Sequence, residues 1–197
     1  MDATHAQEEG AFSLFKRRLL WMLVALLAVS GLVDWWYERD KEHRYDSQIL
    51  LASSRYGVDP ALIKAVVWRE SRFNARARGR VGETGLMQIR ALTAQEWAQA
   101  DGRKRPFEGN LFEPEVNLQV GTWYLGKLLR RYARTDNPVS YALADYNAGR
   151  NNVLRWIKGP AETNSARFVS QITFPSTQEY VRSILRRASK YQGSFKP

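Results

Sequence analysis

The stretch DPALIKAVVWRESRF, residues 59–73, combines a helix start with an unexpected charge. Asp59 followed by Pro60 is typical of a helix beginning, because the Asp side chain caps free N–H groups and Pro suits the first turn. Apolar residues then recur at helical spacing and predict one buried face that also contains a glutamate. This face comprises Ile63, Val66, Val67, Glu70 and Phe73.

Glu70 is the only acid among five arginines within residues 69–80. It is therefore either a surface residue in a solvated network of ion pairs or a carboxyl placed in a cleft for chemistry. Partial burial and the negative end of the helix dipole raise the pKa of such a carboxyl, whereas arginines that point at it lower the pKa. A glutamate that stays protonated near neutral pH is what a general acid for glycosidic cleavage requires.

The composition narrows the possible chemistry. The chain of 197 residues has room for one domain of about 150 residues and a short extra segment. It contains no cysteine, and its two histidines, His5 and His43, lie outside the predicted domain, which excludes a histidine triad and a histidine or cysteine metal site. We therefore expect no metal site, and any acid/base chemistry must come from carboxylates, tyrosines or lysines. The formal net charge of +10 favours an acidic partner: nucleic acid, a membrane surface or an anionic wall polymer.

An uncharged run of fifteen residues, LLWMLVALLAVSGLV, occupies positions 19–33 between a basic triplet and an aromatic cluster. We expect a cytoplasmic segment (1–18), a transmembrane signal anchor (19–37) and a linker (38–45). A signal peptide cleaved near Ala28-Val29-Ser30 and a buried soluble helix are the competing interpretations. Both export hypotheses place the rest of the chain at the periplasmic face of the inner membrane or free in the periplasm, which argues against a nucleic-acid partner.

The remaining sequence predicts a single all-α domain over residues 46–191, with seven or eight helices and a short tail at 192–197. Further helices start at Glu113-Pro114, at Asn137-Pro138 and near Ser176, and Gly149 ends or bends the helix that starts at Asn137. The expected buried stripe of the helix after Pro114 is Val116, Val120, Trp123, Tyr124, Leu128 and Tyr132. That of the last helix is Tyr180, Ile184, Leu185 and Tyr191.

Four short motifs occur in an order and spacing that resemble the Slt-type (family 1) lytic transglycosylases, lysozyme-like enzymes that cut peptidoglycan. A fifth segment resembles the framework helix of that family, and together the matches cover roughly residues 46–191. The segments are ESRFN (70–74), GLMQI (85–89), NLFEPEVNLQVGTWYL (110–125), ADYNAG (144–149) and STQEYVRSIL (176–185).

The resemblance implies a lysozyme-like fold, no cofactor, and Glu70 as the single catalytic acid/base. It also implies that six residues contact the glycan or orient the carboxyl: Ser71, Met87, Gln88, Tyr146, Asn147 and Tyr180. Such an enzyme cuts the bond between MurNAc and GlcNAc and closes a 1,6-anhydro ring, so that no water is consumed. The implied partners are peptidoglycan glycan strands and, through the N-terminal helix, the membrane.

The sequence departs from the family pattern at three places. Gly79 stands where the family often has a serine, Glu83 where it has a small residue, and Arg90-Ala91 where it has Met-Pro. Glu83 could bring a second carboxylate to the cleft, which keeps open a hydrolase that resembles goose-type lysozyme. A non-catalytic wall-binding scaffold and, from charge alone, a nucleic-acid-binding protein also stay open.

Overall fold

The helix predicted from residues 59–73 is α3 (Pro60–Ser71) in the structure, a computed structural model that describes residues 3–102 and 109–195, parts of the first helix by their backbone alone. The Asp59 side chain accepts a hydrogen bond from the backbone N–H of Ala61 at 2.8 Å, which confirms the predicted cap. All residues from Ala61 to Val67 are buried. A helix that is buried on every side lies in the middle of a fold.

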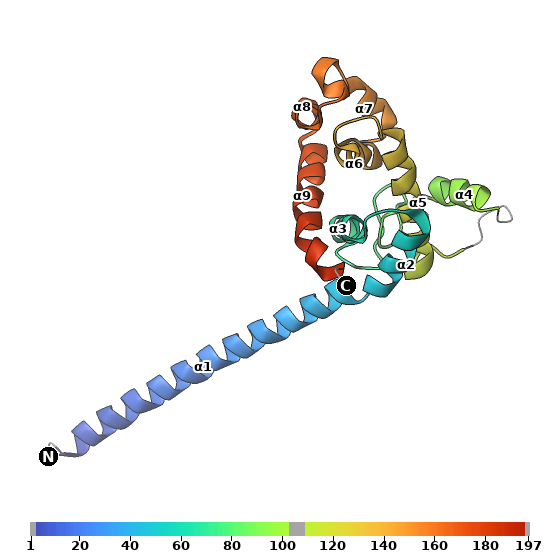
Figure 1. Cartoon of the computed structure of the whole chain (residues 1–197). Coiled ribbons are helices and arrows are strands. Elements are labelled where there is room, and N and C mark those ends of the chain that lie inside the picture. Colours follow the sequence, from blue (N-terminus) through green and yellow to red (C-terminus); the bar gives the residue numbers. More distant parts are fainter. Residues whose placement is uncertain (1–2, 103–108, 196–197) are drawn as a thin grey trace. The chain divides into compact units, whose positions relative to one another are not determined.

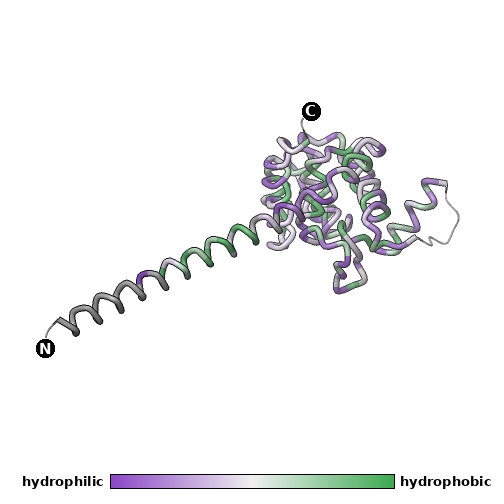
Figure 2. Tube along the Cα trace, turned by 90° about the horizontal axis from the view of Figure 1, so that it is seen from below, coloured by the Kyte–Doolittle hydropathy of each residue, from purple (hydrophilic) through white to green (hydrophobic). Residues whose placement is uncertain are grey.

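The chain divides into two units, Met1–Arg44 and Tyr45–Pro197. The first unit contains α1 (Ala3–His43), which includes the apolar run (green in Figure 2) and continues into the predicted linker. Among the described residues, no helix is both long and apolar enough to cross a membrane, so the predicted anchor over 19–37 is not supported. Fifteen uncharged residues make a helix of about 22 Å, against a hydrocarbon core of about 30 Å.

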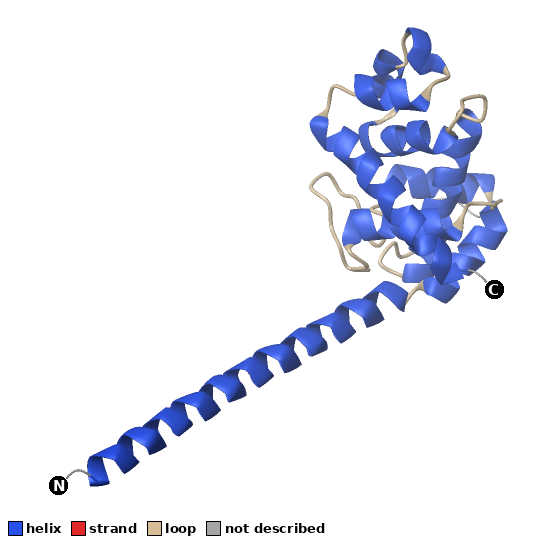
Figure 3. Ribbon diagram, turned by 60° about the vertical axis from the view of Figure 1, so that its left-hand side comes forward, coloured by secondary structure: helices blue, strands red, loops and turns tan. Residues whose placement is uncertain are grey.

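The second unit is built from helices and loops over its described residues, which confirms the all-α prediction (Figures 1 and 3). α3 packs along α9 and against α2, while α5 joins α2, α4 and α6. α6 also packs on α7, α8 and α9. Apart from α3, the elements are α2 (Asp46–Tyr56), α4 (Ala91–Ala100), α5 (Pro114–Arg131), α6 (Pro138–Ala148), α7 (Arg150–Trp156), the 3₁₀ turn η1 (Gly159–Glu162), α8 (Ser165–Gln171), α9 (Pro175–Tyr191) and the turn η2 (Gln192–Phe195).

α3 ends two residues earlier than the periodicity predicts. Arg72 and Phe73 adopt left-handed backbone conformations, with φ of 51° and 61°, so the chain leaves the helix immediately after Ser71. Phe73 is nevertheless buried, at 4% exposure, because the turn folds its ring back into the core. Glu70 therefore stands in the last turn of α3, beside a sharp change of chain direction.

The face that α5 turns to the core agrees only in part with the predicted one. Val120, Leu128 and Tyr132 of the predicted stripe are buried, but Val116, Trp123 and Tyr124 are only partly so. The remaining buried positions are Leu118, Leu125 and four small or polar residues that an apolar pattern does not count: Asn117, Gly121, Thr122 and Gly126. A Cβ at Gly121 would lie 2.8 Å from the Cβ of Met87, so only glycine allows this close approach.

The segment between α3 and α4 crosses the domain without a regular strand. Two isolated antiparallel bridges, Arg78 with Thr84 and Thr84 with Ile89, fold it into an irregular hairpin. The hairpin carries the GLMQI motif at 85–89 and lays it against α5 and α6. Hydrogen bonds described below hold it there.

Candidate active site

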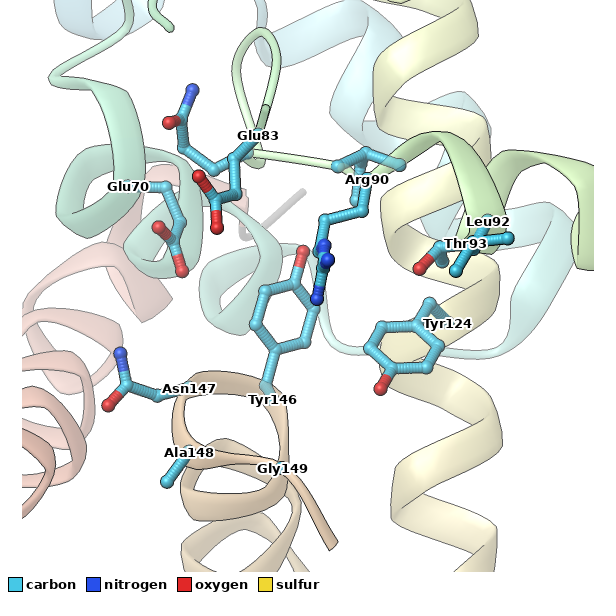
Figure 4. Close-up of a pocket in the computed structure, with 12 residues that line it drawn as sticks. Glu70, Glu83, Arg90, Leu92, Thr93, Tyr124, Tyr146, Asn147, Ala148 and Gly149 are labelled. Atoms are coloured by element: carbon cyan, nitrogen blue, oxygen red, sulfur yellow. The ribbon is translucent and has the colours of Figure 1, made fainter. Parts of the chain in front are cut away.

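The Glu70 carboxyl lies between α3, α6, α9 and the hairpin (Figure 4). Its Oε1 accepts a hydrogen bond from the Tyr180 hydroxyl at 2.5 Å, across 110 positions of sequence. Tyr180 is 2% exposed, because α9 packs along α3 and turns the ring inward. The carboxyl is therefore fixed in orientation by a buried donor.

Burial raises the pKa of Glu70 to about 7, against an ordinary value of 4.5. The hydrogen bond from Tyr180 and the charge of Arg69 lower this pKa, while the negative charge of Glu83 raises it further. Burial prevails, so that protonated and ionised forms are both well populated near neutral pH. A carboxyl with this property can give a proton in one step and take one in the next.

Three of the five arginines around Glu70 stack on aromatic rings. The guanidinium of Arg72 lies 3.7 Å from the ring centre of Trp68, and that of Arg78 lies 4.5 Å from that of Phe112. Arg69 lies over the Tyr180 ring at 5.5 Å, and of these arginines it is the one whose charge lowers the pKa of Glu70. Of the causes that act on Glu70, burial is larger than the charge of Arg69, so its pKa stays high in a basic stretch.

A cavity of about 420 Å³ opens beside Glu70. Of the predicted site residues, Glu70, Gln88, Tyr146 and Asn147 line it, and Tyr180 touches Glu70 from behind. The other lining residues come mostly from the hairpin, from the start of α4 and from α5: Glu83, Ile89, Arg90, Leu92, Thr93, Tyr124, Ala148 and Gly149.

Two predicted residues lie behind the cavity. The side chain of Met87 is fully buried against Gly121, so it does not reach the cleft wall as expected. The hydroxyl of Ser71 lies 2.8 Å from the carbonyl oxygen of Leu86 and 3.1 Å from that of Val67, which ties the hairpin to α3. Both residues therefore act on the site indirectly, because they hold the hairpin in place.

Asn117 of α5 binds both the same hairpin and the loop before α5 through its side-chain amide. Its Oδ1 accepts from the backbone N–H of Met87, and its Nδ2 donates to the carbonyl oxygens of Thr84 and Leu111, each at 2.8 Å. The Tyr146 hydroxyl donates to the carbonyl oxygen of Met87, also at 2.8 Å. These bonds hold Gln88 with a left-handed φ of 49° at the cavity.

Asn117→Ala is expected to lower the free energy of unfolding by about 3 kcal/mol, because three backbone groups lose their partner inside the protein. Gln119→Ala serves as the control, since this amide lies on the same helix and accepts a hydrogen bond from the exposed Arg55. Urea unfolding of both variants measures the difference. Equal unfolding midpoints for the two variants would contradict the role given to Asn117.

α6 brings Tyr146 and Asn147 to the cavity and is fixed from two sides. The Oδ1 of Asn147 accepts from the Thr177 hydroxyl of α9 at 2.8 Å. Asp145, at 2% exposure, accepts from Arg131 and from the Tyr132 hydroxyl at the end of α5. The site therefore depends on the joint packing of α5, α6 and α9.

Arg90, Leu92, Thr93 and Tyr124 are lining residues that were not predicted. The only sequence feature that pointed to this part of the cavity is Arg90-Ala91, which stands where the lytic transglycosylase motif has Met-Pro. Arg90 is exposed, and its side chain extends beside Tyr146 (Figure 4). Tyr124 reaches the cavity because α5 is rotated relative to the predicted face.

A family model described as the transglycosylase SLT domain matches residues 47–169, more than half of the chain. An inactive glutamate-to-glutamine variant of the lytic transglycosylase Slt from Pseudomonas aeruginosa is 28% identical, with a TM-score of 0.70 over 77% of this chain. The 70-kDa soluble lytic transglycosylase from Escherichia coli is 26% identical, with a TM-score of 0.67 over 76% of this chain.

A complex of the 70-kDa soluble lytic transglycosylase with bulgecin A is also similar, at 26% identity and a TM-score of 0.67 over 79% of this chain. This chain spans about a quarter of the length of each of these structures: 24%, 24% and 25%. The helical arrangement, the partly buried glutamate and the sequence match agree with one another. The chain belongs to the transglycosylase SLT domain family.

Proposed function

We propose that this chain is a peptidoglycan lytic transglycosylase that cleaves the β-1,4 bond between MurNAc and GlcNAc and leaves 1,6-anhydroMurNAc. The observation that carries the proposal is Glu70, a carboxyl with a pKa near 7 that lines a cavity and accepts a hydrogen bond from Tyr180. The family match and the similarity to lytic transglycosylases support the reaction type.

The proposed reaction uses Glu70 twice. Protonated Glu70 gives its proton to the glycosidic oxygen, and the N-acetyl group of MurNAc stabilises the positive charge that develops at its anomeric carbon. Ionised Glu70 then takes the proton of the MurNAc 6-hydroxyl, whose oxygen attacks the same carbon and closes the anhydro ring. A pKa near the working pH suits a group that must act first as acid and then as base.

Tyr180 has a distinct role in this scheme. Its hydroxyl donates to Oε1 of Glu70, so the opposite oxygen of the carboxyl is left to exchange the proton with substrate. The same hydrogen bond stabilises the carboxylate that forms after the first step. Tyr180 therefore orients the acid and supports its ionised form.

The charge distribution suits an acidic polymer. The chain carries a formal net charge of +10, and the exposed Arg90 lines the cavity. Peptidoglycan stem peptides carry carboxylates, which a guanidinium binds well. We therefore propose glycan strands of peptidoglycan as the partner.

The products test the proposal directly. Purified sacculi are incubated with the full chain, and the soluble fragments are analysed by mass spectrometry. Fragments that end in 1,6-anhydroMurNAc are expected. Free reducing ends would favour a hydrolase, for which Glu83 in the cavity is the supporting observation. Binding to sacculi without any released fragment would favour a scaffold.

We further propose that the domain works in the periplasm, because the proposed substrate lies outside the cytoplasmic membrane. Fractionation of cells that express the full chain, followed by protease treatment of spheroplasts, tests this location. A chain that is protected from the protease until the spheroplasts are lysed would contradict it.

A further inference from the structure

Glu83 is a second acidic residue in the cavity and comes from the hairpin. Figure 4 shows the Glu70 and Glu83 side chains extending from neighbouring segments into the same space. The backbone of the hairpin holds Glu83 in place, since its carbonyl oxygen accepts from the N–H of Gly79 at 2.8 Å and its Oε2 accepts from the N–H of Val81 at 3.2 Å. The second carboxyl therefore has a defined position beside the first.

Gly79 provides the room that the Glu83 side chain occupies. A Cβ at position 79 would lie 2.8 Å from the Cβ of Glu83 and 2.9 Å from Oε1 of Gln88, and closer still to Oε2 of Glu83. Any side chain at position 79 would displace Glu83 or Gln88. Glycine is required at position 79 because a side chain would not fit there, and not because of its backbone angles. The effect of a substitution at position 79 should therefore depend on which residue occupies position 83.

The proposed reaction calls for a hydrogen-bond acceptor for the N-acetyl N–H of the substrate, and Glu83 can supply one. Glu70 exchanges protons with the glycan oxygens, and the Oδ1 of Asn147 already accepts from Thr177. In the proposed reaction the N-acetyl oxygen moves toward the anomeric carbon, and its amide N–H becomes a stronger donor as positive charge builds up. Among the described residues that line the cavity, Glu83 is the one other carboxyl that could accept from this N–H.

We propose that Glu83 accepts a hydrogen bond from the N-acetyl N–H of the sugar beside Glu70 and thereby assists attack by the acetyl oxygen. This inference rests on the proposed function. The C1–O4 bond breaks with its electron pair on O4, which takes the proton of Glu70, while the acetyl oxygen bonds to C1 and forms an oxazolinium. The 6-hydroxyl oxygen then bonds to C1, its proton returns to Glu70, and the C1–acetyl electron pair returns to the carbonyl.

Glu83 is also expected to affect the pKa of Glu70, together with the other charged and titratable groups that face this carboxyl. The groups that face Glu70 are Tyr180 from α9, Arg69 from α3, Tyr146 from α6 and, from the hairpin and its end, Glu83 and Arg90. The negative charge of Glu83 raises the pKa of Glu70. Removal of that charge lowers the pKa, so the proton needed for the first step is lost at a lower pH.

Glu83→Gln, which keeps the shape of the side chain, is expected to lower kcat roughly 10- to 100-fold with little change in KM, because the lost interaction strengthens only in the transition state. The fall of activity with rising pH should also begin at a lower pH than in the wild type. Glu96→Gln is the control, since this exposed residue pairs with Lys127 outside the cavity. Unchanged kcat and an unchanged pH profile for Glu83→Gln would overturn the proposal.

A stable analogue gives a readout that does not depend on turnover. The thiazoline of the N-acetylated sugar imitates the oxazolinium and places its ring nitrogen where the amide nitrogen lies. Glu83→Gln is expected to bind it about 10- to 100-fold more weakly than the wild type by calorimetry. Equal binding by the two proteins would overturn the role of Glu83, whereas absent anhydro products from the wild type would overturn the proposed function instead.

The coupling to position 79 is tested with a double-mutant cycle. Gly79→Ala is expected to lower kcat to a similar extent as Glu83→Gln, because its Cβ displaces the carboxyl. In a Glu83→Ala background, Gly79→Ala should cost much less. If the effects of Gly79→Ala and Glu83→Ala on kcat were fully additive, the two positions would not be coupled. Should Gly79→Ala fail to fold, the isosteric Glu83→Gln and the analogue still decide the role of Glu83.

Discussion

Glu70→Gln is expected to lower the rate of glycan cleavage by roughly three orders of magnitude, because one group is lost as acid in the first step and as base in the second. Glutamine keeps the size of the side chain and can still accept a hydrogen bond from Tyr180. Release of anhydromuropeptides from sacculi measures the effect, with Glu96→Gln as the exposed control. Residual activity within tenfold of the wild type would exclude Glu70 as the acid/base.

The same substitution should stabilise the fold at high pH. The folded state raises the pKa of Glu70 from 4.5 to about 7, so it binds the proton more tightly than the unfolded chain does. The contribution of protonated Glu70 to the free energy of unfolding is fully present below pH 4.5 and is lost as the pH rises through 7. The loss is about 3 kcal/mol, and the Glu70→Gln variant does not undergo it because glutamine does not ionise.

Urea unfolding at pH 4 and pH 8 checks this prediction. The free energy of unfolding of Glu70→Gln, relative to the wild type, should grow by about 3 kcal/mol between the two pH values. An equal difference at both pH values would mean that the carboxyl is not desolvated in the folded protein. Activity and stability therefore make opposite demands on this residue.

Asp145→Ala is expected to lower the free energy of unfolding by about 3 to 5 kcal/mol, because it leaves Arg131 and Tyr132 without their buried acceptor. The Oδ2 of Asp145 lies 2.6 Å from Nη1 of Arg131 and 2.8 Å from the Tyr132 hydroxyl, and Asp145 is 2% exposed. For a domain of this size the loss corresponds to a fall in Tm of about 10 °C.

Glu179→Ala is the matched control for Asp145→Ala. It breaks an ion pair with Arg186 in which the side chains are 57% and 64% exposed, and such pairs contribute at most about 1 kcal/mol. Thermal unfolding followed by circular dichroism compares the two. If both variants melted within about 2 °C of the wild type, the buried network would not hold α5 and α6 together.

Local chemistry in the sequence was sufficient to predict most of the helices. Asp59 and Asn137 cap the helices that follow them, each with a proline in the first turn, and both side chains accept the expected backbone N–H. Helix caps depend on residues only two or three positions apart, so they can be predicted from the sequence without knowledge of the fold. The position of Glu70 in the last turn of α3 follows from the same local pattern.

Periodicity failed where the packing surface consists of small or polar residues. Gly121 and Asn117 are central to the buried face of α5, one by close approach to Met87 and the other by three hydrogen bonds. Neither residue contributes to an apolar stripe, so the predicted face was rotated and Tyr124 was assigned to the core instead of the cavity wall. The burial of Met87 follows from the same contact.

The sequence by itself determined an all-α domain, the start of α3 and a glutamate at its end, because caps and helical periodicity act between neighbours along the chain. The tertiary structure alone decided that Tyr180 donates to Glu70 across 110 positions and that Gly79 makes room for Glu83 beside it. Burial and charge at Glu70 depend on α6, α9 and the hairpin, and these meet only when the whole domain has folded.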